Sequence, residues 1–356
     1  AQLAAEMNAR RQNAGALIAA VDLPSGVDGD TGEVHPHAVQ ADLTLTIGAP
    51  KTGLVADSAT RHVGRLEVIP LEELPPPEGE RQLLTPHGLR PVLPPPPFEF
   101  HKGEAGRVGI VAGSMGFLGA ALLTARGALR GGGGLVSLFV PEGLYPLMVA
   151  AGPPHELMVR PVASWDMLCD TPLDALVVGP GLGRPAPTPR SDLLALLAAF
   201  RGPVVLDADA LNLLAAESRL DLLREGMVLT PHPGEMERLD PSGTGLDRAT
   251  RALGFVARHP VTLLLKGART LVATQGEPLC YNSSGTPGMA SGGQGDVLSG
   301  LIGALLARGL PSHPAACCGA WLAGRASEVA LHAPAAASPS LLAGDTAAFL
   351  GAAFRE

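Results

Sequence analysis

Short apolar runs alternate with longer Ala- and Leu-rich segments from about residue 107 to the end of the chain. The short runs have the length of strands, and the longer segments have the spacing of helices. Strands that alternate with helices predict βαβ units and a mostly parallel sheet. The predicted strands, each ending in or followed by Gly, Pro, Asp, Thr or Lys, are residues 108–112, 135–140, 175–178, 204–206, 227–230 and 261–265.

Several of these strands are nearly unbroken hydrophobic runs, which is typical of strands covered by helices on both faces. The pattern therefore predicts an α/β domain with three layers, α/β/α. Ligands of such sheets bind at the carboxyl ends of the strands. The residues that follow each strand are for that reason the first candidates for chemistry.

The first 72 residues have a different pattern. Two strand-like runs, 17–21 and 42–47, flank a glycine- and aspartate-rich stretch. About 70 residues with two or three strands is small for an independent core. We therefore expect this segment to pack against another part of the protein.

A proline-rich stretch between residues 71 and 100 predicts an extended connector of the polyproline type, although a surface loop explains it equally well. The predicted organisation is a first unit over residues 1–72, a linker over 73–100 and a main domain over 101–356.

Composition narrows the classes of function. Hydrophobic residues make up 46% of the chain and charged residues 17%, which indicates a globular protein. Aromatic residues make up 3%, too few for the stacking surfaces that bind single-stranded nucleic acid. The formal net charge of -8 opposes broad attraction to nucleic acid or an anionic membrane, but it leaves room for a local phosphate pocket.

The cysteines bear on the cellular compartment. The four cysteines have no C-x-x-C spacing; they are Cys169, Cys280, Cys317 and Cys318. We therefore expect them to be buried free thiols in a reducing cytosol. Apart from His232, the histidines show no metal-ligand spacing and are interpreted as structural or surface residues. No apolar run reaches the roughly 20 residues that span a bilayer, and the start AQLAAEMNARRQ has no cleavable apolar core. A cytoplasmic protein is expected.

The motif GMASGGQGD at residues 288–296 carries the sharpest chemical signal. It is followed at once by the helical run VLSGLIGALLARG. A glycine-rich loop that opens a helix points free N–H groups at an anion, reinforced by the helix dipole, and so forms a phosphate cradle. Asp296 at its end can accept the proton of an attacking hydroxyl while the N–H groups stabilise a transferring phosphoryl group. A plain turn and helix cap is the alternative.

Two further motifs follow predicted strands. In KGART at residues 266–270, the cations of Lys266 and Arg269 can neutralise nucleotide phosphates. The alternative is that the motif is a β-hairpin turn. The two interpretations are compatible. In TPHPGE at residues 230–235, Pro233 and Glu235 suit the first turn of a helix. Capping does not require His232, which is therefore a candidate substrate contact or proton carrier, unless it only bonds the loop.

Three more strand ends carry glycine or acid. They are DADALN at 207–212, GPGLG at 179–183 and GSMGFLG at 113–119. Asp207 and Asp209 can order a metal or a substrate hydroxyl, although Asp209 or Asn212 can equally cap the next helix. Five such strand ends in one sheet predict a shared cleft.

Together these motifs resemble the ADP- or ATP-dependent NAD(P)H-hydrate dehydratases, which have a ribokinase-like fold. The resemblance covers residues 83–356 through HKGEAGRVGIVAGS, GPGLG, LDADALN, TPHPGE, LKGART and GMASGGQGD. It implies a hydrated-dinucleotide site at Gly119, Ala120, Ala121, Gly181, Gly183, His232 and Asp296. It also implies a site for ADP or ATP at Lys266, Gly267, Ala268, Arg269, Thr270, Gly292, Gly293 and Gly295, with Mg²⁺ carried by the nucleotide.

The reaction that the resemblance implies is phosphorylation of the hydroxyl on C6 of the hydrated nicotinamide ring, followed by loss of phosphate. Asp296 is then the base for the hydroxyl proton, and intact NADH or NADPH is re-formed.

Residues 1–72 resemble the last third of an NAD(P)H-hydrate epimerase domain, a partial Rossmann-like fragment, through AVDLPSGVDGDTG and ADLTLTIGAPKTGL. The resemblance implies a substrate-contacting acid at Asp22 and a potassium (K⁺) ligand at Ser25. The earlier half of that domain, with its glycine- and asparagine-rich loop, is absent from the sequence. An epimerase site is therefore expected to be incomplete, whether by truncation or by decay to a structural remnant.

Two other functions fit the same motifs. A ribokinase-like kinase of a vitamin precursor would share Asp296 and the anion-binding loop but stop at the phosphorylated product. A nucleotide-binding scaffold or sensor is the third hypothesis, which the retained Asp296 opposes. The family also implies a homo-oligomer, with the C-terminal helices as the candidate interface, although an Ala-rich buried helix explains their sequence as well.

Overall fold

The computed structural model describes residues 2–71, 79–184, 187–333 and 336–356. Within these ranges, ten strands form one large sheet and three form a small one. In spatial order the large sheet contains β4 (Arg81–Leu84), β13 (Leu279–Asn282), β12 (Leu271–Thr274), β11 (Thr262–Leu265), β10 (Met227–Leu229), β9 (Val204–Leu206), β8 (Ala175–Val178), β5 (Arg107–Val111), β6 (Leu135–Pro141) and β7 (Leu157–Val162).

Among the described strands of this sheet, β12 alone runs against the rest. The sequence predicted β5, β6, β8, β9, β10 and β11 to within a residue at each end, and the mostly parallel sheet is confirmed. The hairpin alternative for KGART is also confirmed, because β11 and β12 pair antiparallel across that turn.

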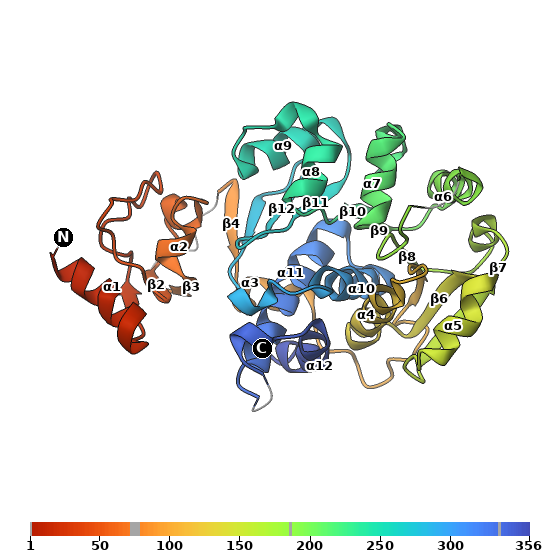
Figure 1. Ribbon diagram of the computed structural model, residues 1–356, viewed down its shortest axis with the longest axis horizontal. Helices are drawn as coiled ribbons and strands as arrows, with labels where there is room; N and C mark the ends of the chain where they lie inside the picture. Colours follow the sequence, from red (N-terminus) through yellow and green to blue (C-terminus); the bar gives the residue numbers. More distant parts are fainter. Residues whose placement is uncertain (1, 72–78, 185–186, 334–335) are drawn as a thin grey trace.

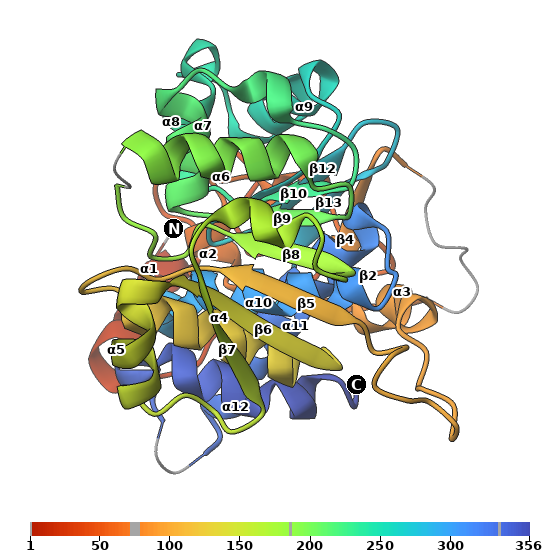
Figure 2. The same ribbon diagram turned by 90° about the vertical axis from the view of Figure 1, so that its right-hand side faces the viewer.

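Helices cover both faces of the sheet (Figures 1 and 2). The helices α4 (Leu118–Arg130), α5 (Tyr145–Ala150), α10 (Gln294–Ala307), α11 (Ser312–Ala330) and α12 (Ala343–Ala353) share one hydrophobic core with one face. The helices α6 (Pro187–Ala199), α7 (Asp209–Ala216), α8 (Pro233–Leu239) and α9 (Arg248–Arg258) share a second core with the other. The three-layer α/β/α architecture is therefore as predicted.

The linker prediction over residues 73–100 does not hold from residue 81 onward, where the chain forms regular structure. Residues 72–78 lie outside the described residues, but β4 pairs in parallel with β13 along its whole length. It is followed by α3 (Pro86–Leu89), whose first turn is capped by the Thr85 side chain. A strand joined to the sheet edge belongs to the main domain, so this domain begins by residue 81.

The N-terminal segment packs against the main domain, as its small size predicted. It contains α1 (Gln2–Ala14), β1 (Ala19–Val21), β2 (Leu43–Ile47), α2 (Thr60–Val63) and β3 (Arg65–Ile69), with the strands in a parallel sheet of order β1-β2-β3. Leu54, Val63 and Leu66 belong to the same hydrophobic cluster as the α7–α9 face. Arg65 also forms an ion pair of 2.8 Å with the buried Glu328 of α11.

Glycines allow α4 and α10 to pack in direct backbone contact. A Cβ on Gly300 would lie 1.9 Å from the Thr124 carbonyl oxygen, and a Cβ on Gly127 would lie 2.2 Å from that of Val297. Such distances exclude any side chain at both positions. The glycines therefore fix where the first turn of α10, which carries Asp296, lies relative to α4.

All four cysteines are free thiols, as expected, but Cys169 is exposed, contrary to the prediction that all four are buried. Helix α11 is buried within the chain itself, so the buried-helix explanation of its apolar sequence holds. In the described ranges no helix is long and apolar enough to cross a membrane.

Replacing Gly300 with alanine should lower the free energy of unfolding by about 1–3 kcal/mol, because the new methyl group must push α4 and α10 apart. Gly254→Ala is the matched control, since Gly254 is exposed in α9 and a Cβ there meets open space. It should raise the same free energy by about 0.5–1 kcal/mol. Urea unfolding measures both, and two changes of the same sign would contradict this account.

Candidate functional site

Five neighbouring parallel strands bring the predicted motifs to one edge of the sheet. The loops after β5, β8, β9, β10 and β11 begin at Gly113, Gly179, Asp207, Thr230 and Lys266. From β5 the chain passes outward to β6 and β7, then crosses to β8 on the other side of β5. This reversal is a topological switch point, where the loops diverge and leave a crevice for ligands.

Main-chain hydrogen bonds join each of these loops to its neighbour. The Gly113 amide donates to the Pro180 carbonyl at 2.9 Å, and the Lys266 amide donates to the Pro231 carbonyl at 2.9 Å. The Ser114 hydroxyl donates to the Gly181 carbonyl at 2.9 Å. The strand ends thus lie side by side, whereas the shared cleft stays a prediction.

Gly181 and Gly183 both have positive φ, near 63° and 67°. A Cβ on Gly181 would lie 2.8 Å from that of Ala120, so this loop lies directly against the first turn of α4. A Cβ on Gly119 would meet open space. The structure therefore brings Gly119, Ala120 and Gly181 together, while Ala121 is buried beneath them.

A buried ion pair lies at the centre of the strand ends. Asp207, 1% exposed, accepts a hydrogen bond of 2.8 Å from Lys266 Nζ through one carboxylate oxygen. The other oxygen accepts a hydrogen bond of 2.7 Å from the Ser299 hydroxyl of α10. The sequence analysis missed Ser299, although its position one helical turn after Gly295 was a usable signal.

Glu235 is the second carboxylate near Lys266, with 3.8 Å between Oε2 and Nζ. Burial alone would lower the pKa of Lys266, but the charges of Asp207 and Glu235 and the hydrogen bond to Asp207 outweigh burial, so its pKa is raised. Lys266 therefore remains an ammonium ion that holds the ends of β9, α8 and β11 together.

Asp296 is the third residue of α10, directly after the glycine-rich loop. Burial raises its pKa to about 7, with a further increase from Asp207 and Asp209 that is only partly offset by Lys266. A carboxylate with a pKa near neutrality is matched to proton abstraction at physiological pH. The predicted catalytic base is therefore in a suitable electrostatic environment.

The glycines of the loop have separate roles. Gly293 is the N-cap of α10 with φ near 92°, in the left-handed region. A Cβ on Gly295 would lie 3.2 Å from Lys266 Nζ. A Cβ on Gly292, in contrast, would meet open space, so this part of the loop is accessible to a ligand.

His232 is the N-cap of α8, which corrects the sequence argument that capping does not need it. Its Nδ1 accepts hydrogen bonds from the amides of Gly234 at 3.0 Å and Glu235 at 3.4 Å, while Glu235 accepts one from the His232 amide at 2.8 Å. The ring proton is therefore on Nε2, and the side chain remains 52% exposed. Capping and substrate contact are compatible.

Asp209 contacts the GPGLG loop as well as beginning α7. Its carboxylate accepts a hydrogen bond of 2.7 Å from the Gly183 amide. Neither Asp209 nor Asn212 caps that helix, because the N-cap residue is Ala208, at a positive φ near 50°. Asn212 instead accepts a hydrogen bond from Arg238 of α8.

The KGART turn differs from expectation in one respect. Arg269 is 4% exposed and donates to the Gly64 carbonyl of the N-terminal segment at 2.7 Å. Its cation thus joins the two parts of the chain and is not available to neutralise phosphate, in contrast to the prediction. Gly267 and Ala268 are exposed, and Thr270 donates to the Gly267 carbonyl.

Arg248, which the sequence analysis missed, holds this turn from α9. It donates to the carbonyls of Leu265 and Arg269, both at 3.0 Å, and forms an ion pair of 3.0 Å with Asp57. A Cβ on Gly267 would lie 2.5 Å from its guanidinium. No motif in the sequence indicates this role.

Asp22 and Ser25 lie in the N-terminal segment. Asp22 pairs with Lys51 and accepts a hydrogen bond of 3.1 Å from the Ile47 amide; these two hydrogen bonds lower its pKa. Ser25 is exposed, and its carbonyl accepts from the Val39 amide.

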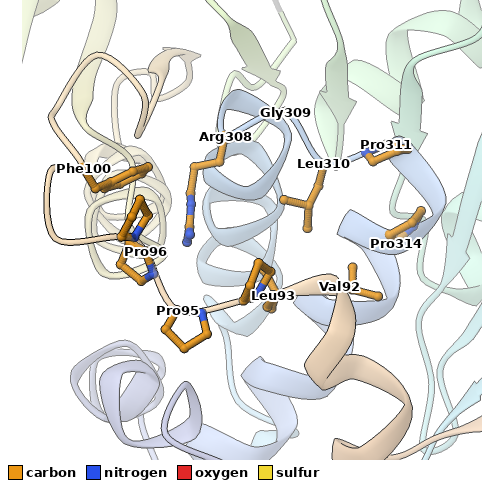
Figure 3. Close-up of a pocket in the computed structure, with 12 residues that line it drawn as sticks. Val92, Leu93, Pro95, Pro96, Phe100, Arg308, Gly309, Leu310, Pro311 and Pro314 are labelled. Carbon is orange, nitrogen blue, oxygen red and sulfur yellow. The ribbon is translucent and has the colours of Figure 1, made fainter.

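Two surface pockets of about 370 and 640 Å³ lie away from these motifs. The first is lined by residues 92–97 and 308–311, with Phe100 and Pro314 (Figure 3). Arg308 stands 5.8 Å from the centre of the Phe100 ring. Residues 308–311, which line both pockets, follow the C-terminus of α10, about 20 Å along the helix from Asp296. The pockets are therefore not part of the predicted site.

Comparison with known proteins now defines the class. The fold resembles a ribokinase-like superfamily protein from Enterococcus faecalis V583, with a TM-score of 0.69, 24% identity and coverage of 80% of this chain and 98% of the other. It also resembles an ADP/ATP-dependent NAD(P)H-hydrate dehydratase from Bacillus subtilis co-crystallized with ATP/Mg²⁺, with a TM-score of 0.64, 28% identity and coverage of 77% and 98%. The protein therefore has an α/β fold of the ribokinase-like class.

A family model described as NAD(P)H-hydrate dehydratase matches residues 108–347, and one described as YjeF-related protein N-terminus matches residues 1–53. Bifunctional NAD(P)H-hydrate repair enzymes Nnr are 39% identical, in Moorella thermoacetica over 93% of this chain and in Escherichia coli K12 over 88%. The chain belongs to the NAD(P)H-hydrate dehydratase family. It spans 65% and 61% of the length of those two relatives.

Replacing Asp207 with asparagine should move the pKa of Asp296 below about 7. The substitution removes a negative charge that raises this pKa, and it leaves Lys266 free to stabilise the Asp296 carboxylate. The change is measured by carboxyl ¹³C NMR titration. Asp221→Asn, which removes an exposed partner of Arg219, is the control and should leave the value unchanged. An unaltered Asp296 titration in Asp207→Asn would show that burial alone sets its pKa.

Proposed function

We propose that the protein dehydrates hydrated NADH or NADPH in a reaction driven by ADP or ATP. The observation that supports it most strongly is Asp296, whose pKa is raised to about 7 at the start of a glycine-opened helix. Family membership narrows the substrate to a hydrated nicotinamide dinucleotide.

In this proposal the Asp296 carboxylate takes the proton of the C6 hydroxyl as its oxygen attacks the terminal phosphorus of the nucleotide. ATP leaves as ADP, or ADP as AMP. The electron pair of the ring nitrogen then expels phosphate from C6, and loss of a proton from C5 restores the dihydropyridine. Hydrate and ATP thus give NAD(P)H, ADP and phosphate.

The amides of the loop that contains Gly292, Gly293 and Gly295 are proposed to bind the nucleotide phosphates, because they open a 14-residue helix and Gly292 faces open space. The turn of Lys266–Thr270 is proposed to contribute its exposed backbone at Gly267 and Ala268. Gly119, Gly181, Gly183 and His232 are proposed to border the hydrated dinucleotide.

Magnesium fits the charge of this site. Asp207 and Asp209 both raise the pKa of Asp296, and Lys266 offsets them only in part. A magnesium ion that arrives with the nucleotide would supply the missing positive charge and needs few protein ligands. Asp207, Asp209 and Asp296 are the residues that would lie near it.

For residues 1–72 we propose no complete activity. The assignments of Asp22 as a substrate-contacting acid and Ser25 as a ligand of K⁺ remain predictions, as does assembly into a homo-oligomer. We propose small-molecule partners and a cytoplasmic location for the whole chain.

Asp296→Asn should abolish the nucleotide-dependent recovery of reduced-nicotinamide absorbance from hydrated NADH. In the wild type, kcat/KM should rise as pH increases through about 7, because the carboxylate form of Asp296 is the base. The loss in the variant should be at least about 100-fold, the usual contribution of a general base.

Measuring phosphate release in the same assay distinguishes the proposed dehydratase from a vitamin-precursor kinase. A vitamin-precursor kinase would consume ATP without releasing phosphate and without restoring NADH. Full activity in Asp296→Asn would refute the proposed base. Absence of recovery with either nucleotide would refute the dehydratase.

Substitutions at His232 separate capping from substrate contact. His232→Ala should lose about 1 kcal/mol of stability, because two amides of α8 lose their acceptor. His232→Asn keeps a capping oxygen and should retain stability, yet it should raise KM for the hydrate because the imidazole Nε2, which lies 3.5 Å from Glu235 Oε1, is gone. Steady-state kinetics and urea unfolding measure the two effects, and an unchanged KM in His232→Asn would leave His232 with capping alone.

A further inference from the structure

Three side chains that no proposed step uses converge at the opposite edge of the large sheet. Cys280 of β13 and His313 and Cys317 of α11 place their ligand atoms within 4.8 Å of one another. His313 Nε2 lies 3.6 Å from both sulfur atoms. The sequence analysis expected no ligand spacing for His313, whereas the structure brings it next to two cysteines.

The fold explains how the three residues meet. His313 and Cys317 are four residues apart in α11, so they share one face of the helix. Cys280 comes from the β12–β13 hairpin against which α11 packs, where it pairs with Val272. Sequence spacing could reveal the helical pair but not the third residue, which is 33 positions earlier.

We propose that Cys280, His313 and Cys317 form a binding site for a thiophilic metal ion, Zn²⁺. Two thiolates and an imidazole are the donors that Zn²⁺ prefers. With Zn–S near 2.3 Å and Zn–N near 2.05 Å, a tetrahedral ion separates sulfur from nitrogen by about 3.6 Å. Both sulfur–nitrogen distances have this value before any ion is bound.

A hydrogen-bond chain orients the imidazole for this role. His313 Nδ1 lies 3.0 Å from the Thr274 hydroxyl, which lies 2.9 Å from the hydroxyl of the buried Thr262. When Nδ1 donates to Thr274, the lone pair on Nε2 points at the two sulfur atoms. Metal-binding histidines are oriented in this way by a partner on the other ring nitrogen.

Both cysteines are buried, and His313 is intermediate in exposure. Its neighbours Ser312 and Pro314 line the two surface pockets; Pro314 is visible in Figure 3. The three residues supply three of the four ligands of a tetrahedral Zn²⁺ ion.

The ion would not share a residue with the proposed reaction. Cys280 pairs with Val272, which pairs with Leu264, so its position on the sheet is two strands and two residues away from Lys266. We infer a structural role, in which the ion joins α11 to the β12–β13 hairpin. This role does not depend on the proposed dehydratase activity.

Cobalt titration of the reduced, chelator-treated full chain tests the proposal, because Co²⁺ bound to thiolate gives a sulfur-to-metal charge-transfer band. The expected result is one equivalent of Co²⁺ with that band, which is lost when Zn²⁺ is added. Cys280→Ser, Cys317→Ser and His313→Ala should each weaken binding at least about 10-fold, as loss of an orienting partner alone does.

Cys318→Ser is the matched control. Cys318 is a buried neighbour in the same helix, its pKa raised to about 12 by burial alone, and it is not part of the cluster. It should bind Co²⁺ as the wild type does. Cys169→Ser controls for the exposed thiol in the same way.

Three outcomes would overturn the proposal: no thiolate band in the reduced wild type, an unchanged band in Cys317→Ser, or equal loss in Cys318→Ser. If the protein in air forms a Cys280–Cys317 disulfide while the reduced protein binds no Co²⁺, the cluster is a redox pair instead. Circular dichroism shows whether each variant is folded, and the wild-type titration decides the question even if a variant is not.

Discussion

The buried contact between Asp207 and Lys266 is the interaction on which the arrangement of the site depends. Taking both charges out of water is costly, so such a pair adds little net stability, but removing one partner leaves an uncompensated charge. Lys266 is surrounded by Asp207 and Glu235, and Asp207 also accepts from Ser299. One ammonium ion thus fixes β9, α8, β11 and α10 relative to one another.

The same contact determines the chemistry of Asp296. Lys266 is already paired with Asp207. It therefore offsets only part of the increase in the pKa of Asp296, the second carboxylate, in the first turn of α10. The dipole of the helix favours an anion there, whereas burial and the neighbouring acids oppose it. The result is a carboxyl group that ionises near neutral pH, where it can both take a proton from a hydroxyl and release it.

The central strands and the strand-end motifs could be predicted because uninterrupted apolar runs and glycine- or acid-bearing ends are local signals. Three strands that the sequence analysis missed, β3, β4 and β7, are edge strands with polar residues or proline, such as Arg160 and Pro161 in β7. The interior strands β12 and β13 entered only through the hairpin alternative for KGART. Arg269 was assigned to phosphate from its charge at a strand end and from the family resemblance. Its actual partner, the Gly64 carbonyl, is 205 positions away, and no local pattern encodes such a contact.

The strands β11, β12 and β13 connect the candidate site with the proposed metal site. The turn after Lys266 joins β11 to β12, and Arg269 and Arg248 hold it against the N-terminal segment. Thr274, at the end of β12, and Cys280 of β13 contact His313 of α11. Asn282, the last residue of β13, and Ser284 donate hydrogen bonds to the carbonyls of Ala320 and Trp321 in α11. Because β12 begins at the turn that is proposed to bind the nucleotide and pairs with β13, an ion that fixes the start of α11 against β13 would also restrict that turn.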